Sequence, residues 1–215
     1  MRSLFLFIWL GITTPLVAQI PVEIFAGHQK TTLDIMFFKF FKRKKENSPW
    51  LFFNRNRASI DYRMTKTEYL PQFGFTEAVS YNHPKLKGFA PVVVGQVFNW
   101  SVVPKAGMQY ALVKQNVTVF GWVVTETLPK PSIDFFVLFR YAPQLYKQLH
   151  LFVQAESANA FPTHSSKPFS FTQRLRLGLK IKDWQWGAGI DGNQTGRQQS
   201  FIFTYNVGGF LRHEF

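Results

Sequence analysis

The sequence predicts an all-β fold, an antiparallel up-and-down transmembrane β-barrel of about twelve strands. Three observations predict it. Period-two alternation of apolar and polar residues dominates the chain, as in strands with one apolar face. Aromatic residues make up 18% of the chain, with 25 Phe, 7 Tyr and 6 Trp, yet the mean hydropathy is near neutral at −0.07. A transmembrane barrel combines these properties, because aromatic girdles and an apolar outer surface enclose a polar lumen.

The alternation is clearest in the last three predicted strands, residues 171–181, 184–191 and 201–215. Lys182-Asp183 is predicted as the tight turn between the first two. One face of the last strand carries Phe201, Phe203, Tyr205, Val207, Gly209, Leu211, His213 and Phe215. A largely apolar face of this kind fits a strand that contacts lipid on one side.

The segment that ends on Phe215 resembles the final strand of Gram-negative outer-membrane barrels, whose terminal aromatic residue helps the assembly machinery to recognise them. Gly209 and His213 depart from that pattern, since large apolar residues are usual at their positions. The resemblance implies an outer-membrane location. It also implies contact with outer-membrane lipid and lipopolysaccharide, and recognition by the barrel assembly machinery through Phe215.

Residues 1–18 are predicted to be a secretory signal peptide. Met1-Arg2 provides a positive start, Leu4 to Leu10 is apolar, and Val17-Ala18 offers small residues for cleavage. The apolar stretch is too short and too interrupted for a membrane anchor, which is the alternative. Cleavage near Ala18 would leave residues 19–215 as the barrel domain.

The strand count depends on the N-terminal part of the barrel domain. Nine further segments are predicted as strands: 22–27, 33–41, 51–63, 73–82, 90–100, 106–112, 117–126, 133–141 and 149–156. Together with the last three they make twelve, and an even number fits single-chain bacterial barrels. The alternative is ten strands. In that case residues 34–43 would form an amphipathic segment on the periplasmic surface or inside the lumen.

The connections alternate between two kinds. The predicted periplasmic turns are 83–88, 114–116, 143–148 and 182–183. The predicted outer loops are 65–72, 101–104, 128–132, 161–168 and 192–199. This order has the parity expected of a chain whose C-terminus is periplasmic, although outer loops are usually longer.

The chain is strongly basic, with 25 Lys+Arg against 12 Asp+Glu and a formal net charge of +13. Basic proteins often bind nucleic acid, but export to the cell surface makes that partner unexpected here. Lipid A phosphates and small anionic solutes are the expected partners instead. The absence of cysteine decides little, because a domain of this size can fold without disulfides.

Many ionic side chains fall on the predicted inward faces. The basic ones, which are the candidate pore-lining residues, are Arg55, Arg57, Arg63, Arg140, Arg174, Arg176, Lys180 and Arg212. The acidic ones are Asp61, Glu126, Asp134, Glu156, Asp191 and Glu214. One interpretation is a lumen closed by ion pairs, as in many small barrels. The other is a narrow channel with a basic strip that favours anions.

A twelve-stranded, Arg-lined barrel of this length looks like the small saccharide-acid porins of the oligogalacturonate and sialic-acid channel type. The resemblance is one of architecture and assigns no individual residue. The predicted function is therefore a small porin-like channel or ligand-binding barrel with a basic lumen. The alternatives are a closed structural or accessory barrel of an outer-membrane complex, and a soluble β-sandwich at the level of the fold.

An enzyme is the least favoured function. The nearest arrangement to a catalytic dyad of a lipid A-modifying hydrolase is His164-Ser165-Ser166 in a predicted outer loop. No nucleophile motif surrounds it, so no catalytic residue is predicted. The other histidines are scattered without metal-ligand spacing, so no metal or other cofactor is predicted.

Overall fold

A computed structural model describes residues 20–43, 46–63, 71–98, 101–197 and 200–215. The predicted signal peptide lies outside these residues. The strands are β1 (Pro21–Gly27), β2 (Lys30–Arg43), β3 (Glu46–Asp61), β4 (Gln72–Tyr81), β5 (Phe89–Phe98), β6 (Ser101–Val113), β7 (Val117–Glu126), β8 (Ser132–Tyr141), β9 (Gln144–Tyr146), β10 (Leu149–Pro162), β11 (Phe169–Ile181), β12 (Trp184–Arg197) and β13 (Ser200–Glu214). A 3₁₀ turn, η2 (Pro84–Leu86), precedes β5. No helix in the described part of the chain is long and apolar enough to cross a membrane.

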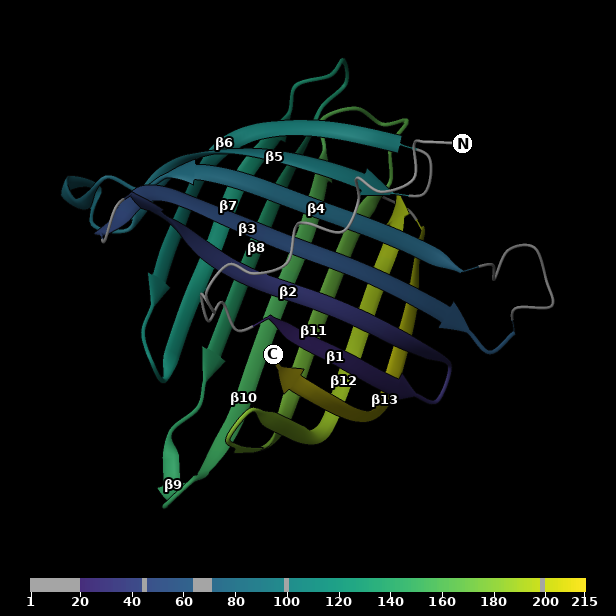
Figure 1. Cartoon of the computed structure of the whole chain (residues 1–215). Helices are drawn as coiled ribbons and strands as arrows, with labels where there is room; N and C mark the ends of the chain where they lie inside the picture. Colours follow the sequence, from purple (N-terminus) through teal and green to yellow (C-terminus); the bar gives the residue numbers. More distant parts are fainter. Residues whose placement is uncertain (1–19, 44–45, 64–70, 99–100, 198–199) are drawn as a thin grey trace, which may run out of the picture.

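The strands form one closed antiparallel ring. Each barrel strand pairs with the next along the chain, β10 pairs with both β8 and β11, and β1 pairs with β13 to close the ring (Figure 1). The three-residue β9 pairs only with the start of β10 and stands outside the ring. The ring therefore contains twelve strands. The prediction of an antiparallel twelve-stranded barrel is confirmed, and the ten-stranded and β-sandwich alternatives are wrong.

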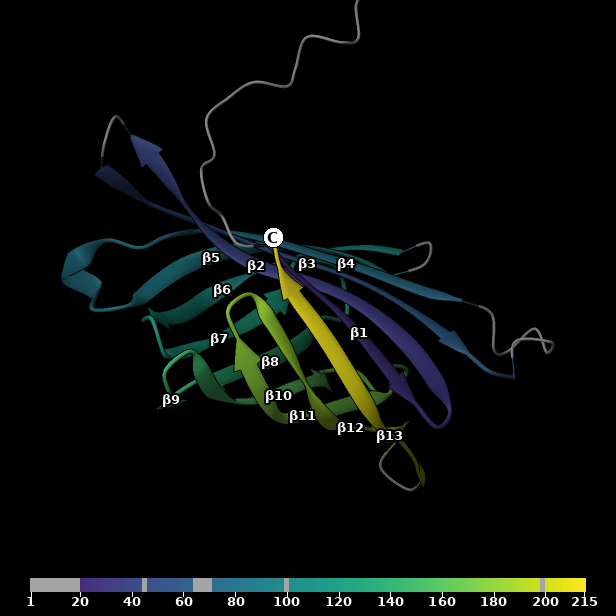
Figure 2. The same cartoon turned by 60° about the horizontal axis from the view of Figure 1, so that its bottom comes forward.

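Both ends of the described chain lie at the same end of the barrel. The Ile20 N–H donates to the Phe215 carbonyl at 3.0 Å, and the Phe215 N–H donates back to Ile20 at 3.2 Å. The predicted periplasmic turns lie at this terminal end, and the described strand ends that flank the predicted outer loops lie at the opposite end, here called the loop end (Figure 1). The barrel is flattened, with β2–β5 along one wall and β8–β12 along the other (Figure 2).

Two of the predicted outer loops are wrong in extent. Residues 101–104 belong to β6, and residues 192–197 belong to β12. Glycine and polar residues suggested loops, but backbone hydrogen bonds hold a ladder together whatever the side chains. The pairing continues as far as Arg197 with Ser200 and Phe98 with Ser101, so these hairpins extend further than their apolar faces.

The outer surface is an apolar band between two aromatic girdles. At the terminal end the exposed rings are Trp50, Tyr81, Phe89, Tyr141, Trp184 and Phe215. At the loop end they are Phe73, Phe135, Phe161, Phe201 and Phe203. Aliphatic residues such as Val93 (65% exposed) and Val137 (51% exposed) cover the wall between them. This surface fits the core of a lipid bilayer with an interface at each end.

The interior is divided between apolar and ionic packing. One buried apolar cluster on β2–β8 consists of Met36, Leu51, Phe53, Ala78, Val92, Val94, Phe120, Trp122, Val124, Phe136 and Leu138. Phe53 stacks on Phe120 with ring centroids 5.1 Å apart. The apolar character of both faces of β7 follows from this, because its inward residues contribute to the cluster and its outward residues belong to the apolar band of the outer surface. The ionic side chains come from both walls, from β1 and β10–β12 as well as from Asp34 of β2 and Arg55 of β3.

A closed barrel of this kind resists detergent until it is heated. We expect the unboiled protein to migrate on an SDS gel at a different apparent mass from the boiled protein, because the ring has no free edge from which to unravel. The measurement is a gel of folded, detergent-solubilised protein with and without heating. Identical migration of a sample that retains the β-sheet circular dichroism signal would contradict the closed barrel.

Candidate functional site

Arg55 spans the interior of the barrel. It lies on β3, where its guanidinium donates to Asp34 of β2 at 3.1 and 2.5 Å and pairs with Glu156 of β10 at 2.8 Å. Arg57, two residues further along the same face, contacts the same Asp34 carboxylate at 2.6 Å. These bonds tie the β2–β3 wall to the opposite wall through the centre of the lumen.

A second ionic centre surrounds Glu23 of β1. Its carboxylate accepts from Arg176 at 3.0 Å and also pairs with Arg212. Arg176 continues to Asp191 at 2.7 Å and lies over the Phe25 ring at 3.9 Å from the centroid. Arg176 is only 2% exposed, so its charge depends on these partners in place of water.

The remaining predicted residues join or flank these centres. Arg174 pairs with Glu156 at 3.2 Å, Arg140 donates to Gln154 at 2.9 Å, and Lys180 pairs with Glu214 at 2.5 Å. Seven of the eight candidate residues are thus gathered inside the barrel, as parts of an ion network. Arg63 is the exception: it lies just beyond β3 and pairs with Asp61 at 2.8 Å with its side chain 55% exposed.

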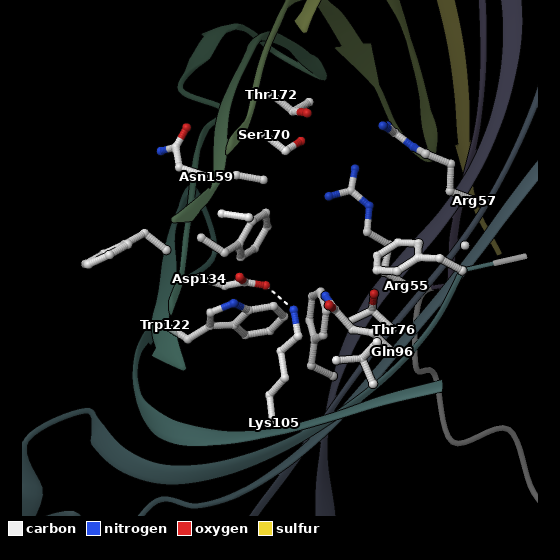
Figure 3. Close-up of a pocket in the computed structure, with 18 of the residues that line it drawn as sticks. Arg55, Arg57, Thr76, Gln96, Lys105, Trp122, Asp134, Asn159, Ser170 and Thr172 are labelled. Atoms are coloured by element: carbon white, nitrogen blue, oxygen red, sulfur yellow. Dashed lines mark hydrogen bonds and ion pairs between the residues drawn. The ribbon is translucent and has the colours of Figure 1, made fainter. Parts of the chain in front are cut away.

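A cavity of about 470 Å³ occupies the loop-end half of the interior (Figure 3). Its cationic lining residues are Arg55, Arg57, Lys105 and Arg174, and its acidic ones are Glu126 and Asp134. Rings of Phe53, Trp122 and Phe136 form one side, and polar groups such as Gln96, Ser170 and Thr172 line the rest. Figure 3 shows Lys105 bonded to Asp134 across the cavity beside Trp122.

The cavity lining carries four cationic and two acidic side chains. Its arginines are also paired from behind, Arg55 and Arg57 with Asp34, and Arg174 with Glu156 and, at 3.8 Å, with Asp191. A guanidinium presents a planar set of donors that suits carboxylate and phosphate oxygens. The arrangement can therefore bind a small anion, with the aromatic side available for an apolar or ring-shaped portion of the same molecule.

The ion network separates this cavity from the terminal end. A second hollow, between Glu23, Asp34, Arg140 and Arg212, measures only about 10 Å³. That is room for about one water molecule. The bridge that Arg55 makes between Asp34 and Glu156 lies between the cavity and this hollow.

Sequence reasoning missed three of the residues that shape the site. Glu23 and Asp34 face each other across β1 and β2 and hold four arginines between them, and Lys105 provides a cation on β6. Alternation on β1, β2 and β6 places all three on inward faces, so the signal was present. The alternation in these three strands was hard to recognise, because β1 is short and the apolar pattern of the strands is weak.

The loop between β10 and β11 contains the histidine and serines considered for catalysis. His164 Nδ1 is 2.9 Å from Ser166 Oγ, and the Ser166 N–H donates to the same nitrogen at 3.2 Å. This is a local turn contact between residues two apart. Among the described residues no carboxylate bonds to His164, and no group of three or more His, Cys, Asp or Glu could hold a metal ion.

Comparisons with known proteins give similarity at the level of structure. No protein-family model matches the chain, and no curated sequence matches it. A solved structure of the KdgM porin in complex with disordered oligogalacturonate shares 10% identity, over 92% of this chain and 99% of that chain, with a TM-score of 0.48. A second KdgM porin structure shares 12% identity over the same fractions, with a TM-score of 0.47.

The central carboxylates should contribute strongly to stability. We expect Glu23→Gln to lower the free energy of unfolding by about 3–5 kcal/mol, because it leaves two buried arginines without their shared partner. Asp61→Asn, which removes an exposed pair, is the control and should cost no more than about 1 kcal/mol. The measurement is reversible urea unfolding in lipid vesicles. Equal losses in the two variants would show that the buried network does not stabilise the barrel.

Proposed function

We propose that this chain is a porin-like barrel of the Gram-negative outer membrane, whose loop-end cavity takes up small anionic solutes. The observation that carries the proposal is the excess of cations in that cavity, where four basic side chains meet two acidic ones. The apolar band and the two aromatic girdles support the membrane location. A basic lining lowers the energy of an entering anion and raises that of a cation.

The bridge at Arg55 acts in this proposal as the constriction of the pathway. Its bonds to Asp34 and Glu156 cross the lumen just below the cavity, and both acids are also held by other arginines. An anion that binds Arg55 competes with these carboxylates for the same donors. Solute entry and loosening of the bridge are therefore coupled, which would give small conductance with anion preference.

A closed structural or accessory barrel is the second candidate. The observation that favours it is the deep burial of the interior polar side chains, among which Arg176, Gln185 and Asn206 are each 2% exposed or less. In that case the cavity would be a binding pocket that is closed toward the terminal end of the barrel. The expected surface partners, lipopolysaccharide and the barrel assembly machinery, belong to either candidate. Phe215, which is 70% exposed at the end of the chain, supports recognition by that machinery.

Anion entry into the cavity can be followed through Trp122. We expect iodide to quench the fluorescence of the folded protein more than caesium does, because Trp122 lines the basic cavity. The difference should disappear in Trp122→Phe and weaken in Arg57→Gln. Lys180→Gln removes the same charge from the interior away from the cavity and serves as the control. Equal quenching by the two ions in the wild type would contradict an anion-binding cavity.

Passage through the barrel can be measured in planar bilayers under a KCl gradient. We expect small currents whose reversal potential indicates a preference for chloride. Arg55→Met with Glu156→Gln removes both partners of the constricting bridge and should raise the conductance several-fold, because the cavity then meets the terminal end. No current from either protein, both being folded by gel shift, would exclude the channel and favour the closed barrel.

A further inference from the structure

The lipid-facing wall carries almost no charge, with two exceptions on neighbouring strands. Among the strand residues whose side chains the structure describes, Lys39 of β2 and Glu77 of β4 are the charged side chains at outward positions. Lys39 lies near the terminal end, close to the exposed Phe41, where a lysine can reach the interface. Glu77 has no such route. It is the central outward residue of β4, between Phe75 and Val79.

Polar side chains surround Glu77 on the outer face. Asn54 of β3 lies directly opposite it and donates to its carboxylate at 3.3 Å. Asn56 is the next outward residue of β3 and lies opposite Phe75. Asn54, Asn56 and Glu77 are here called the polar patch. They lie at mid-height on a wall that is otherwise apolar.

The hydrogen bonds of the polar patch are incomplete. Asn54 Oδ1 and Asn56 Oδ1 are buried without a partner, and Glu77 has the single bond from Asn54 among the described residues. Lipid tails provide no donors or acceptors, so unmet polar groups at this depth are costly. Ionisable residues within a membrane usually face a protein partner or a polar cavity. The two amide oxygens are shielded inside the wall, whereas the exposed Glu77 carboxylate can accept a further donor that the chain itself does not supply.

The residues beside the polar patch are small, so the surface of another protein can approach the patch closely. Gly95 of β5 pairs with Glu77, and a side chain added at Gly95 would meet nothing within 4 Å. Its neighbour on β6 is Pro104, followed by Ala106 on the same face. Figure 2 shows that this wall belongs to the flattened side of the barrel. Small residues on a flat wall let another protein surface approach the polar groups closely.

We propose that this wall is the interface of a homodimer, in which Glu77 of each copy accepts a hydrogen bond from Asn56 of the other. Asn54, Asn56, Phe75 and Glu77 form one cross-strand cell. Because strands of membrane barrels tilt by about 35–45°, the Glu77–Asn56 diagonal runs nearly along the membrane plane. The Asn54–Phe75 diagonal then runs nearly along the membrane normal.

A two-fold axis can run along the membrane normal and pass beside Asn54 and Phe75. Rotation about this axis brings Glu77 of one copy to the position of Asn56 of the other. It places the Glu77 carboxylate opposite the Asn56 amide of the second copy, twice over. A carboxylate only accepts and an amide nitrogen only donates, so the two corners complement each other. In an isologous dimer the same patch of both copies forms the interface, so the patch must be complementary to itself. Here a second copy of the chain provides the matching groups, and no other protein is needed. The inference rests on the membrane location but not on the conductance of the barrel.

Cross-linking tests the arrangement directly, because the chain contains no cysteine. Phe75→Cys should cross-link to itself across the axis in vesicles under mild oxidation, and Phe75 is 45% exposed. Val137→Cys on the opposite wall, at a position that is 51% exposed, is the matched control and should stay monomeric. Equal cross-linking of the two variants, both being folded by gel shift, would overturn the proposal.

A second measurement tests the polar patch itself. The dimer dissociation constant, measured by sedimentation in a neutral detergent, should rise about tenfold or more in Glu77→Leu with Asn56→Leu. Gln173→Leu removes an outward polar side chain that is bonded to Asn159 on the other wall and should leave the constant unchanged. A monomeric wild type overturns the proposal, as does a wild type that forms a one-to-one complex with a different protein on this wall. Normal anion currents in either case would leave the proposed function intact.

Discussion

The pairing of β1 with β13 is the constraint on which the rest of the structure depends. Seven residues of β1, from Pro21 opposite Glu214 to Gly27 opposite Gly208, join the two ends of the sheet. Without them two strand edges would expose their backbone polar groups to lipid, which offers no hydrogen bonds. Closure also gives the sheet an inner and an outer side, so the residues on the two faces of each strand meet different environments.

The residues that fill the interior differ between the two sides of the barrel. On the β2–β8 side a buried cluster of aromatic and aliphatic residues shares the interior with Asp34, Arg55 and Lys105. On the β10–β13 side the interior is ionic, and the strands alternate clearly. The cavity lies where the two halves meet, at the loop end. It therefore combines the rings of Trp122 and Phe136 with the cations of Arg57 and Arg174.

The ion network serves structure and function together. Buried charges are costly unless each is paired and hydrogen-bonded, and here a few acids each hold two arginines. Such sharing leaves a few guanidinium nitrogens, those of Arg57 and Arg174 among them, buried without a hydrogen bond. The arginines that hold the walls together are consequently among the groups that line the cavity. On the outer wall the opposite holds, since the polar patch at Glu77 lacks the partners that the interior ions possess.

The sequence by itself determined the fold class and the inward faces of Arg55, Arg140 and Arg176, because period-two alternation and turn residues are local signals. It favoured twelve strands but left ten open, because the pattern is weaker near the N-terminus. It could not determine which charges meet. Arg55 and Glu156 are far apart in the chain, and only the closure and flattening of the ring bring β3 against β10. The tertiary structure likewise decided that Arg63 lies outside the lumen, that the terminal half is filled and that the loop-end half is hollow. These features depend on how side chains from opposite walls fill one shared volume, which no single strand encodes.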